Sequence, residues 1–360
     1  MAKICHITDA HPRYDIRIFE KECKSLAKTN ELYLIVSDDK DDETVENVHL
    51  VSTGYLPADR LRRITVANYR VYRKAVSLDC DVYHMHDPEL LFFALPLKLR
   101  GKKVVFDSHE NVPGQILSKE WLPLPVRSFV AKCYKGFETF IVKRIDAVVA
   151  ATPYIGTLFA NRAKRVVVVN NYPKMDDIKF QTKPFADRKT DLCYAGNISE
   201  IRGEKTMRAL ASAVKKKLVI AGSCSPEYAK ENSDEYVSYV GNLDRAGVNE
   251  LYSDSKVGLV LLYPTDNYVD SLPIKMFEYM AAGLPFVASD FSLWKEITEE
   301  CGSGICVNPL DIEKISEACL SLLNDPARSE EMGKLGRKAI EEKYNWSIEE
   351  KKLIDCYCAL

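Results

Sequence analysis

The sequence predicts an α/β protein made of two doubly wound, Rossmann-like domains that face an interdomain cleft. The chain has 360 residues, which is more than a single hydrophobic core usually supports. Short apolar runs alternate with longer amphipathic segments, a pattern typical of repeated βαβ units in a parallel sheet. The alternation is interrupted at residues 173–190, which are rich in prolines and charges and are therefore predicted to be a linker.

The first domain, residues 1–172, contains a regular series of short apolar runs. We expect its strands at residues 3–8, 31–37, 81–86, 103–108, 147–152 and 165–171. Helices are expected between them, for example at 17–28 and 126–143. Because the strand runs are continuously apolar, both faces of the predicted sheet should be covered by helices.

The second domain, residues 191–344, repeats this organisation. Its strands are expected at 191–196, 216–222, 237–242, 256–264, 284–289 and 304–309. A helix at about 345–360 should pack back on the first domain. In open α/β sheets, ligands bind beyond the carboxyl ends of the strands. We therefore expect the functional site in the cleft between the domains.

Composition argues against several classes of function and sets the expected location. The chain is 46% hydrophobic and 28% charged, as is ordinary for globular proteins, and its net charge of -2 gives no case for a nucleic-acid partner. The eleven cysteines are scattered without a CxxC pair, which indicates reduced thiols. No apolar stretch is long enough to span a bilayer, and no signal-peptide core is present. We expect a cytoplasmic protein, with attachment to the inner face of the cell membrane left open.

Histidines are concentrated in and just after the predicted strands of the first domain. A single histidine at such a position is more often packed or solvated than functional, and His6 and His84, inside strands, keep that explanation. The expected substrate-binding candidates are the polar residues that follow the strands: His11, Arg17, His86, Asp87, His109 and Glu110.

Two other site chemistries are disfavoured. His86, Asp87, His109 and Glu110 are competent metal ligands, but the sequence has no close-spaced metal motif such as HExxH, so no metal site is expected. A Ser-His-Asp hydrolase would need a GxSxG nucleophile elbow, which the sequence lacks.

In the second domain, the run GNISEIRGEK follows the first predicted strand. A glycine turn followed by a base and another glycine suits an anion at a helix start, and the planar guanidinium of an arginine suits phosphate. The candidates in this run are Gly196, Asn197, Arg202 and Gly203. Further along the chain, backbone groups at Gly241 and Leu243 could face a flat base.

The run SLPIKMFEYMAAGLPFVASD, residues 271–290, predicts a helix, a glycine stop and a buried strand. A helix start offers N–H groups and a positive dipole to phosphates, and the Glu278 carboxylate can accept hydrogen bonds from ribose hydroxyls. Ordinary helix punctuation explains the same pattern. The candidates here are Asp270, Ser271, Leu272, Lys275 and Glu278.

Taken together, these motifs resemble a known family over nearly the whole chain. The turn HDPEL, a second His-Glu turn, the G-x5-RG loop and KMFEYMAAGLPFVASD resemble the bacterial family 4 (group 1) retaining glycosyltransferases of GT-B fold, in the polysaccharide-biosynthesis subgroup. The resemblance implies metal-independent transfer of a hexosyl or N-acetylhexosaminyl group from a UDP- or GDP-sugar to a glycan or lipid-linked acceptor, without a cofactor. An expected product is a surface polysaccharide or glycolipid.

The resemblance also implies roles for individual residues. Glu278 matches the glutamate that holds the ribose hydroxyls, and Asp270 stands where the family has its first glutamate, which contacts the sugar. Arg202 and Gly203 match a Lys-Gly pair at the diphosphate, where Lys275 could supply a second positive charge. His109 matches a histidine near the donor sugar. His109, Asp270 and Glu278 are therefore the expected catalytic residues.

The sequence departs from the family pattern at two places. Asn197 follows Gly196 where the family has an arginine, and DAHPRYD replaces the glycine-rich loop after the first strand. These departures concern the donor-sugar contacts more than the reaction class.

A basic, aromatic stretch at residues 60–74 is not specified by the resemblance. As a helix it would present six bases, which suits docking on anionic lipid, although a solvated helix face explains it equally well. Two other functions remain open, a sugar-nucleotide epimerase of the same architecture and a non-catalytic nucleotide-sugar-binding subunit.

Overall fold

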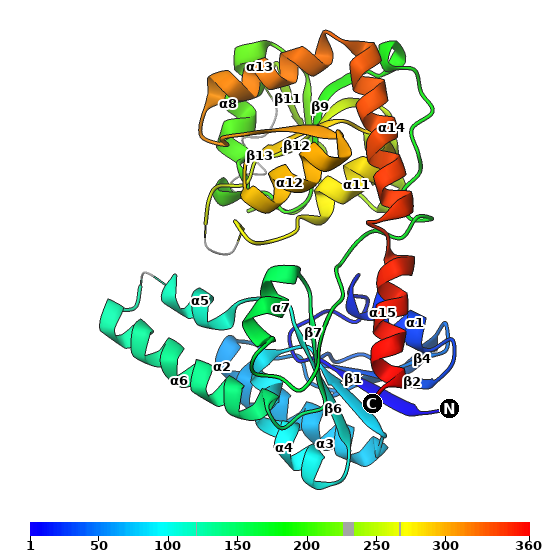
Figure 1. Cartoon of the computed structure of the whole chain (residues 1–360), viewed down its shortest axis with the longest axis vertical. Helices are drawn as coiled ribbons and strands as arrows, with labels where there is room; N and C mark the ends of the chain where they lie inside the picture. The colour runs from blue at the N-terminus through cyan, green and yellow to red at the C-terminus, as the bar shows by residue number, and fades with distance from the viewer. Residues whose placement is uncertain (120, 226–233, 266–267) are drawn as a thin grey trace. The chain divides into compact units, whose positions relative to one another are not determined.

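The computed structural model describes residues 1–119, 121–225, 234–265 and 268–360 (Figure 1). The chain divides into two compact units. Unit 1 comprises Met1–Asn171 and Ser347–Leu360, and unit 2 comprises Tyr172–Trp346. Each unit is a sheet covered by helices, so the predicted fold of two doubly wound α/β domains is confirmed.

Unit 1 contains an eight-stranded sheet in the order β3-β4-β2-β1-β5-β6-β7-β8. Its strand pairs are parallel except for β3 with β4. Chain order reverses direction at β1, which pairs with both β2 and β5, and polar residues at this switch point are well placed for a site. The strands are β1 Lys3–Ile7, β2 Glu31–Val36, β3 Glu43–Val45, β4 Val48–Ser52, β5 Val82–Met85, β6 Lys103–Ser108, β7 Ala147–Ala150 and β8 Val166–Val168.

The helices of unit 1 bury an apolar core that includes Tyr83, Phe106 and Phe159. The predicted helices at 17–28, 60–74 and 126–143 are present with shifted ends. The helical segments are η1 Ile18–Cys23, α1 Lys24–Leu26, α2 Arg60–Arg62, η2 Arg63–Ala67, α3 Asn68–Leu78, η3 Pro88–Phe93, α4 Ala94–Leu99, α5 Val112–Leu117, α6 Leu124–Val142, α7 Pro153–Phe159 and α15 Trp346–Cys358.

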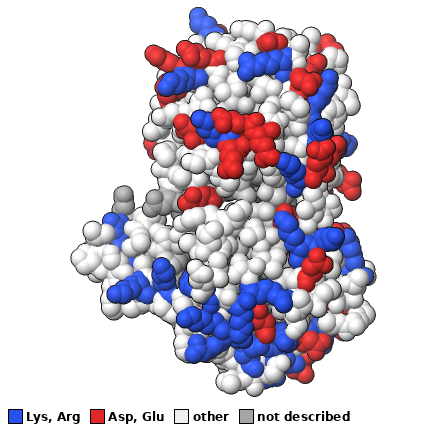
Figure 2. Space-filling view, viewed as in Figure 1, with Lys and Arg blue, Asp and Glu red and all other residues white. Residues whose placement is uncertain are grey.

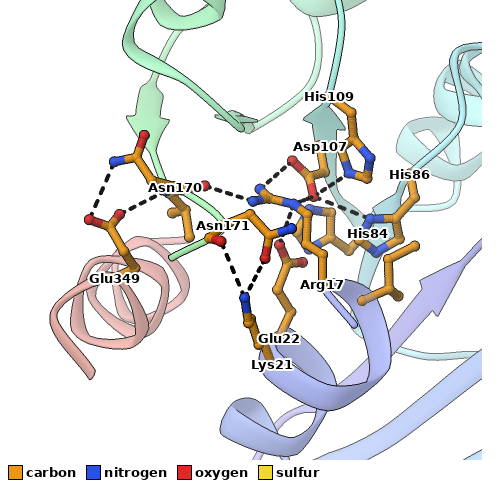
Figure 3. A network of polar contacts seen from close by, with 12 residues as sticks. Arg17, Lys21, Glu22, His84, His86, Asp107, His109, Asn170, Asn171 and Glu349 are labelled. Carbon is orange, nitrogen blue, oxygen red and sulfur yellow. Dashed lines mark hydrogen bonds and ion pairs between the residues drawn. The ribbon is translucent and has the colours of Figure 1, made fainter. Parts of the chain in front are cut away.

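The C-terminal helix α15 is held to the rest of unit 1 by polar contacts. Glu349 accepts hydrogen bonds from the backbone N–H of Asn170 (2.8 Å) and from its side-chain amide (3.3 Å). Lys21 donates to the side chain of Asn171 (2.6 Å) at the same junction (Figure 3). The last helix therefore packs in unit 1, the unit that also contains the N-terminus.

Unit 2 contains a six-stranded sheet, order β11-β10-β9-β12-β13-β14, whose strand pairs are all parallel. Its switch point lies at β9, which pairs with both β10 and β12. All six strands predicted for this domain are present. They are β9 Thr190–Ala195, β10 Leu218–Ala221, β11 Val237–Tyr239, β12 Ser255–Val260, β13 Phe286–Ser289 and β14 Gly304–Val307.

Tight packing fixes α11 against the sheet of unit 2. A Cβ added at Gly258 of β12 would lie 2.7 Å from the ring of Tyr279 on α11, so only glycine allows this approach. The helical segments are η4 Phe185–Asp187, η5 Glu200–Arg202, α8 Glu204–Val214, α10 Arg245–Ser253, α11 Ile274–Ala282, α12 Ser292–Cys301, α13 Ile312–Leu323 and α14 Pro326–Glu342.

Residues 173–190, predicted to be a linker, pack as part of unit 2. Ile178 and Phe185 are buried, and the Gln181 amide donates to the carbonyls of Tyr252 and Ser255 (2.8 and 3.0 Å). Among the described residues, no helix combines the length and apolar character needed to cross a membrane.

Candidate functional site

In unit 2, Lys275 lies directly against the Gly196 turn at the end of β9. A Cβ added at Gly196, which has φ +144°, would lie 2.4 Å from Lys275 Nζ. The ammonium lies over the Tyr194 ring, 4.9 Å from its centroid, and no described residue gives it a hydrogen bond or an ion pair. Burial, together with the charge of Arg202, lowers the pKa of Lys275 to about 8. A bound anion would relieve this cost.

Arg202 is the second cation of this site. It ends η5, and its guanidinium lies 5.7 Å from the centroid of the Tyr268 ring. None of the residues that the structure describes accepts a hydrogen bond from the guanidinium. Gly203, which follows, has φ +79°, and a Cβ there would lie 1.9 Å from the carbonyl oxygen of Leu261. The turn that places Arg202 therefore requires glycine.

Glu278, one turn along α11 from Lys275, is held by two residues of α10. Its Oε1 accepts from Arg245 Nη1 (2.8 Å) and its Oε2 from the Tyr252 hydroxyl (3.1 Å). Only 13% of the Glu278 side chain is exposed, but a carboxylate has further lone pairs for a ligand's hydroxyls. The sequence reasoning missed Arg245 and Tyr252. Arg245 begins the helix that follows Gly241 and Leu243. Because it lies just after a strand end, the rule that ligands bind there could have identified it as a candidate.

The segment before α11 is fixed by its own hydrogen bonds. The Ser271 hydroxyl donates to the Tyr268 carbonyl (2.9 Å), and the Ser271 carbonyl accepts from the Trp294 indole (2.6 Å). Leu272 packs on the apolar core. The helix begins at Ile274, three residues after the predicted start, with Asp270 outside it.

Asn197 and the glycine at the end of β11 complete the loops around these residues. Asn197 Oδ1 accepts from the Ser223 hydroxyl (2.6 Å) and its carbonyl from Tyr194 (2.7 Å). Gly241 has φ +75° and faces open space, and Leu243 is partly buried against the core. The residues predicted for the second domain therefore lie together around the carboxyl ends of β9 and β11 and the start of α11.

In unit 1, the predicted histidines surround an aspartate that the sequence reasoning missed. Asp107, fully buried in β6, accepts from His109 Nε2 (2.8 Å) and lies 3.3 Å from His86 Nδ1 (Figure 3). His86 Nε2 in turn lies 2.8 Å from His6 Nδ1. The carboxylate fixes the orientation of His109, because it binds one ring nitrogen of that residue.

Arg17 is part of the same network, which corrects the expectation that it binds substrate. Its guanidinium makes two 2.9 Å hydrogen bonds to Asp107, one of 2.8 Å to the Val169 carbonyl, and lies 3.1 Å from Glu22. Arg17 is 5% exposed, so its donors face the protein interior. Although burial opposes ionisation, Arg17 and His109 keep the pKa of Asp107 well below its usual range.

A second carboxylate pair lies at the ends of β1 and β5. Asp87 accepts from the Thr8 hydroxyl and the Asp9 backbone (both 2.7 Å), and His11 Nε2 lies 3.6 Å away. Burial and the charge of Asp87 raise the pKa of Asp9 to about 9, which favours the protonated form of Asp9. Burial opposes the charged form of His11, but Asp15 and Asp87 raise its pKa overall.

A cavity of about 420 Å³ in unit 1 is lined by part of these two groups, including His86, Asp107 and His109. Glu110 is an exposed member that accepts from Gln115. The cavity also has basic and apolar walls, which the sequence reasoning did not place beside the histidines. The lining includes His11, His86, Asp87, His109, Glu110, Arg60, Arg63, Ile64, Phe92 and Lys119.

Two groups of side chains in unit 1 are close enough to share a metal ion. One is His86, Asp107 and His109, and the other is His6, Glu22, His84 and His86. Arg17 already neutralises Asp107 and lies 3.1 Å from Glu22. This positive charge opposes a cation at either place.

Two family models match the chain, one in each half. "Glycosyltransferase Family 4" matches residues 21–172 and "Glycosyl transferases group 1" matches residues 189–325. The chain is a family 4, group 1 glycosyltransferase. The second match contains Arg202, Lys275 and Glu278, and the first contains His86 and His109 of this glycosyltransferase.

Curated relatives with similar sequences are mannosyltransferases. A GDP-mannose-dependent monoacylated alpha-(1-6)-phosphatidylinositol monomannoside mannosyltransferase of Corynebacterium glutamicum is 28% identical over 152 residues, 42% of this chain and 35% of that protein. A GDP-mannose-dependent alpha-(1-6)-phosphatidylinositol monomannoside mannosyltransferase of Mycobacterium tuberculosis is 22% identical over 303 residues, 75% of this chain and 76% of that protein. The chain thus spans about a third of the first relative and three quarters of the second.

Two solved structures superpose on nearly the whole chain. A sucrose-phosphate synthase of Thermosynechococcus elongatus superposes with a TM-score of 0.78 at 16% identity, over 100% of this chain and 99% of that one. HepE of Anabaena in complex with UDP superposes with a TM-score of 0.72 at 12% identity, over 99% and 100%. These similarities confirm the GT-B fold of the glycosyltransferase.

Proposed function

We propose that the chain transfers a sugar from a nucleoside-diphosphate sugar to an acceptor hydroxyl, with retention at the anomeric carbon. One observation carries the proposal. Lys275 and Arg202 are cations with no hydrogen bond or ion pair to any described residue, and Glu278 follows Lys275 by one helical turn. Positive side chains suit a diphosphate, and the Glu278 carboxylate can accept hydrogen bonds from ribose hydroxyls.

The same residues would assist departure of the diphosphate. Negative charge builds up on the leaving phosphate as the bond between the anomeric carbon and the phosphate oxygen of the donor breaks. Lys275, Arg202 and the N-terminus of α11 would stabilise this charge. We therefore propose a metal-independent reaction without a cofactor. The leaving phosphate takes the acceptor proton, and Asp270, a shorter acid than the glutamate of the family, contacts the sugar.

The acceptor would bind in the cavity of unit 1. Asp107 orients His109, and His11, His86, Asp87 and Glu110 supply further polar groups around it. We assign His109 a positioning role in this cavity. The named relatives act on glycolipids, so we propose a lipid-linked glycan as acceptor, in glycolipid or surface-polysaccharide synthesis at the cytoplasmic face of the membrane.

Calorimetric titration with UDP and GDP tests the donor site. We expect Glu278→Ala and Arg202→Ala each to weaken binding of whichever nucleotide binds the wild type. Glu313→Ala and Arg328→Ala, on helices α13 and α14 of the same unit, are the matched controls. Unchanged affinity in both site variants would refute the assignment.

Product analysis separates transfer from the two alternative functions. Incubation with the donor alone would yield a changed sugar nucleotide if the chain were an epimerase. A binding subunit would bind nucleotide but release no nucleoside diphosphate, even with a lipid extract. We expect release of the nucleoside diphosphate that depends on acceptor, with the donor sugar recovered in the lipid fraction.

A further inference from the structure

Helix α6 of unit 1 exposes an apolar stripe. In Figure 1, α5 and α6 project from the sheet of unit 1. Positions 126, 129, 130 and 140 fall on one side of a helix of 3.6 residues per turn. Two more large apolar residues lie just before the helix and at its first position. The exposed fractions are Val126 45%, Phe129 69%, Val130 41% and Phe140 48%, with Trp121 76% and Leu124 62%.

The buried side of the same helix contains a charge. Glu138 is 2% exposed and accepts from Arg162 Nη1 (2.7 Å). Its neighbours on that side include the buried Ala131 and Ile141. A helix on the surface of a globular protein normally faces its apolar stripe toward the core. In α6, by contrast, aromatic residues are exposed and an ion pair is buried. Exposed apolar surface of this kind marks an interaction site.

The surroundings of the stripe are positive. Lys143 and Arg144 are exposed at the end of α6, with Arg144 3.7 Å from the centroid of the Phe140 ring. Burial and the charge of Arg60 on α2 lower the pKa of Lys119, which lies two residues after α5. Among the described residues from 111 to 145, no acidic side chain is exposed. Figure 2 shows white atoms over the projecting part of unit 1, with blue side chains beside them.

We propose that this surface, formed by Trp121, Leu124 and the outer side of α6, inserts into the surface of an anionic phospholipid bilayer. Large apolar residues would enter the boundary between head groups and acyl chains, and the basic side chains would meet lipid phosphates. The fluorescent reporter Trp121 has the amphipathic ring favoured at this depth. The basic side chains beside the stripe, with no exposed acid among the described residues 111–119 and 121–145, favour a lipid surface over a second copy of this chain.

The surface lies next to the cavity of unit 1. Ile116 and Lys119 of the α5 region and Arg60 of α2 line that cavity together with His109. A lipid-linked acceptor could therefore keep its chain in the bilayer while its head group enters the cavity. This inference rests on the proposed function for the identity of the acceptor, but the bilayer contact can be tested without catalysis.

The test uses the full chain and vesicles of phosphatidylglycerol and phosphatidylcholine, with pure phosphatidylcholine for comparison. Trp294 and Trp346 are 0% and 3% exposed, so Trp121 is the exposed member of the three tryptophans. We expect its emission to shift to shorter wavelength with anionic vesicles, and the protein to sediment with them. Trp121→Ser/Phe129→Ser should weaken sedimentation at least about ten-fold.

Charge and control variants sharpen the result. Lys143→Glu/Arg144→Glu should weaken binding about five-fold for each positive charge removed and reduce its salt dependence. Leu99→Ser, on α4 and 89% exposed in the wild type, should bind as the wild type does. Calorimetry with the nucleotide should give wild-type affinity in all of these variants, which separates the bilayer contact from the donor site.

Three results would overturn the inference. The first is failure of the wild type to sediment with anionic vesicles, and the second is wild-type sedimentation of the serine double variant. The third is an emission shift that depends on protein concentration without vesicles. The last result would identify the surface as a contact between copies of the chain.

Discussion

The two units differ in whether the charged side chains at the carboxyl ends of their strands are paired within the protein. In unit 2, Lys275 and Arg202 have no hydrogen-bonding or ionic partners among the described residues, and burial lowers the pKa of Lys275 to about 8. In unit 1, Asp107 is bound by Arg17 and His109 before any ligand arrives. The two cations of unit 2 thus have no hydrogen bond or ion pair within the described part of the chain, whereas the central carboxylate of unit 1 is already neutralised by an arginine.

This difference indicates a division of labour. A cation that is costly to bury lowers the stability of the free protein and gains most when an anion binds. The hydrogen bonds of Asp107 to Arg17 and His109 fix the orientation of these side chains, and such a buried network contributes rigid geometry. We therefore expect unit 2 to control donor affinity and unit 1 to control the orientation of groups around the acceptor.

Removal of Asp107 should have the largest effect. Asp107→Ala leaves Arg17 buried beside Glu22 without its two 2.9 Å hydrogen bonds. Breaking a buried pair in this way costs about 3–5 kcal/mol, measured as a loss in the free energy of unfolding of unit 1 in urea. Asp355→Asn, on the exposed side of α15, is the control. A loss below 1 kcal/mol, roughly that of a surface pair, would mean that the network does not stabilise unit 1.

Removal of the Lys275 charge should reduce ligand affinity without reducing stability, the reverse of the effect expected for Asp107. Lys275→Met keeps a side chain of similar length but cannot bind phosphate. Affinity for the nucleoside diphosphate should fall roughly 10- to 100-fold, the value of a hydrogen bond between charged groups, while stability in urea stays equal or rises. A marked loss of stability would show that Lys275 has a structural partner and would remove the contrast between the units.

The pH dependence of donor binding follows from the lowered pKa of Lys275. Below pH 8 the amine is protonated, so the folded protein carries the full cost of the buried charge and attracts the diphosphate. As pH rises from about 8 toward the ordinary value of 10.5, the folded amine loses its proton before the unfolded one. Unit 2 gains stability over this range and loses donor affinity.

Calorimetry at pH 7, 8 and 9 measures this effect. Phosphate groups titrate near pH 6, so the ligand keeps its charge over this range. The wild type should lose several-fold in affinity, while Lys275→Met should stay constant. Equal slopes for the two proteins would assign the titration to another group.

The fold could be predicted because its signal is local. Continuous apolar runs such as residues 103–108 are recognisable without knowledge of neighbours, and all the predicted strands are present. The hairpin of β3 and β4 was missed, because its first strand has three residues in an acidic stretch. Its turn places Glu46 and Asn47 at φ +49° and +64°, which an Asn allows more readily than a Glu.

The site could be predicted only in part, because partners depend on tertiary contacts. The motif around α11 identified Lys275 and Glu278, but Arg245 lies 33 residues away in the sequence from the glutamate it binds. Arg17 was assigned to substrate for a similar reason. Its position after β1 was correct, but its partner carbonyl at Val169 lies 152 residues further along the chain.

Arg245→Ala should change nucleotide affinity least of these variants. It tests whether the Arg245–Glu278 ion pair has a structural role like that of the Arg17–Asp107 pair in unit 1. Arg245 fixes one oxygen of Glu278 at 2.8 Å, with 39% of its own side chain exposed. Its loss should weaken ribose recognition about five-fold, near 1 kcal/mol for a partly exposed ion pair. The measurement compares the affinity for the nucleoside diphosphate with that for its 2′,3′-dideoxy form. We expect a reduced preference in Arg245→Ala and none in Glu278→Ala. Tighter binding in Arg245→Ala would instead identify the arginine as a competitor for the carboxylate, and unit 2 would then share the internal pairing of unit 1.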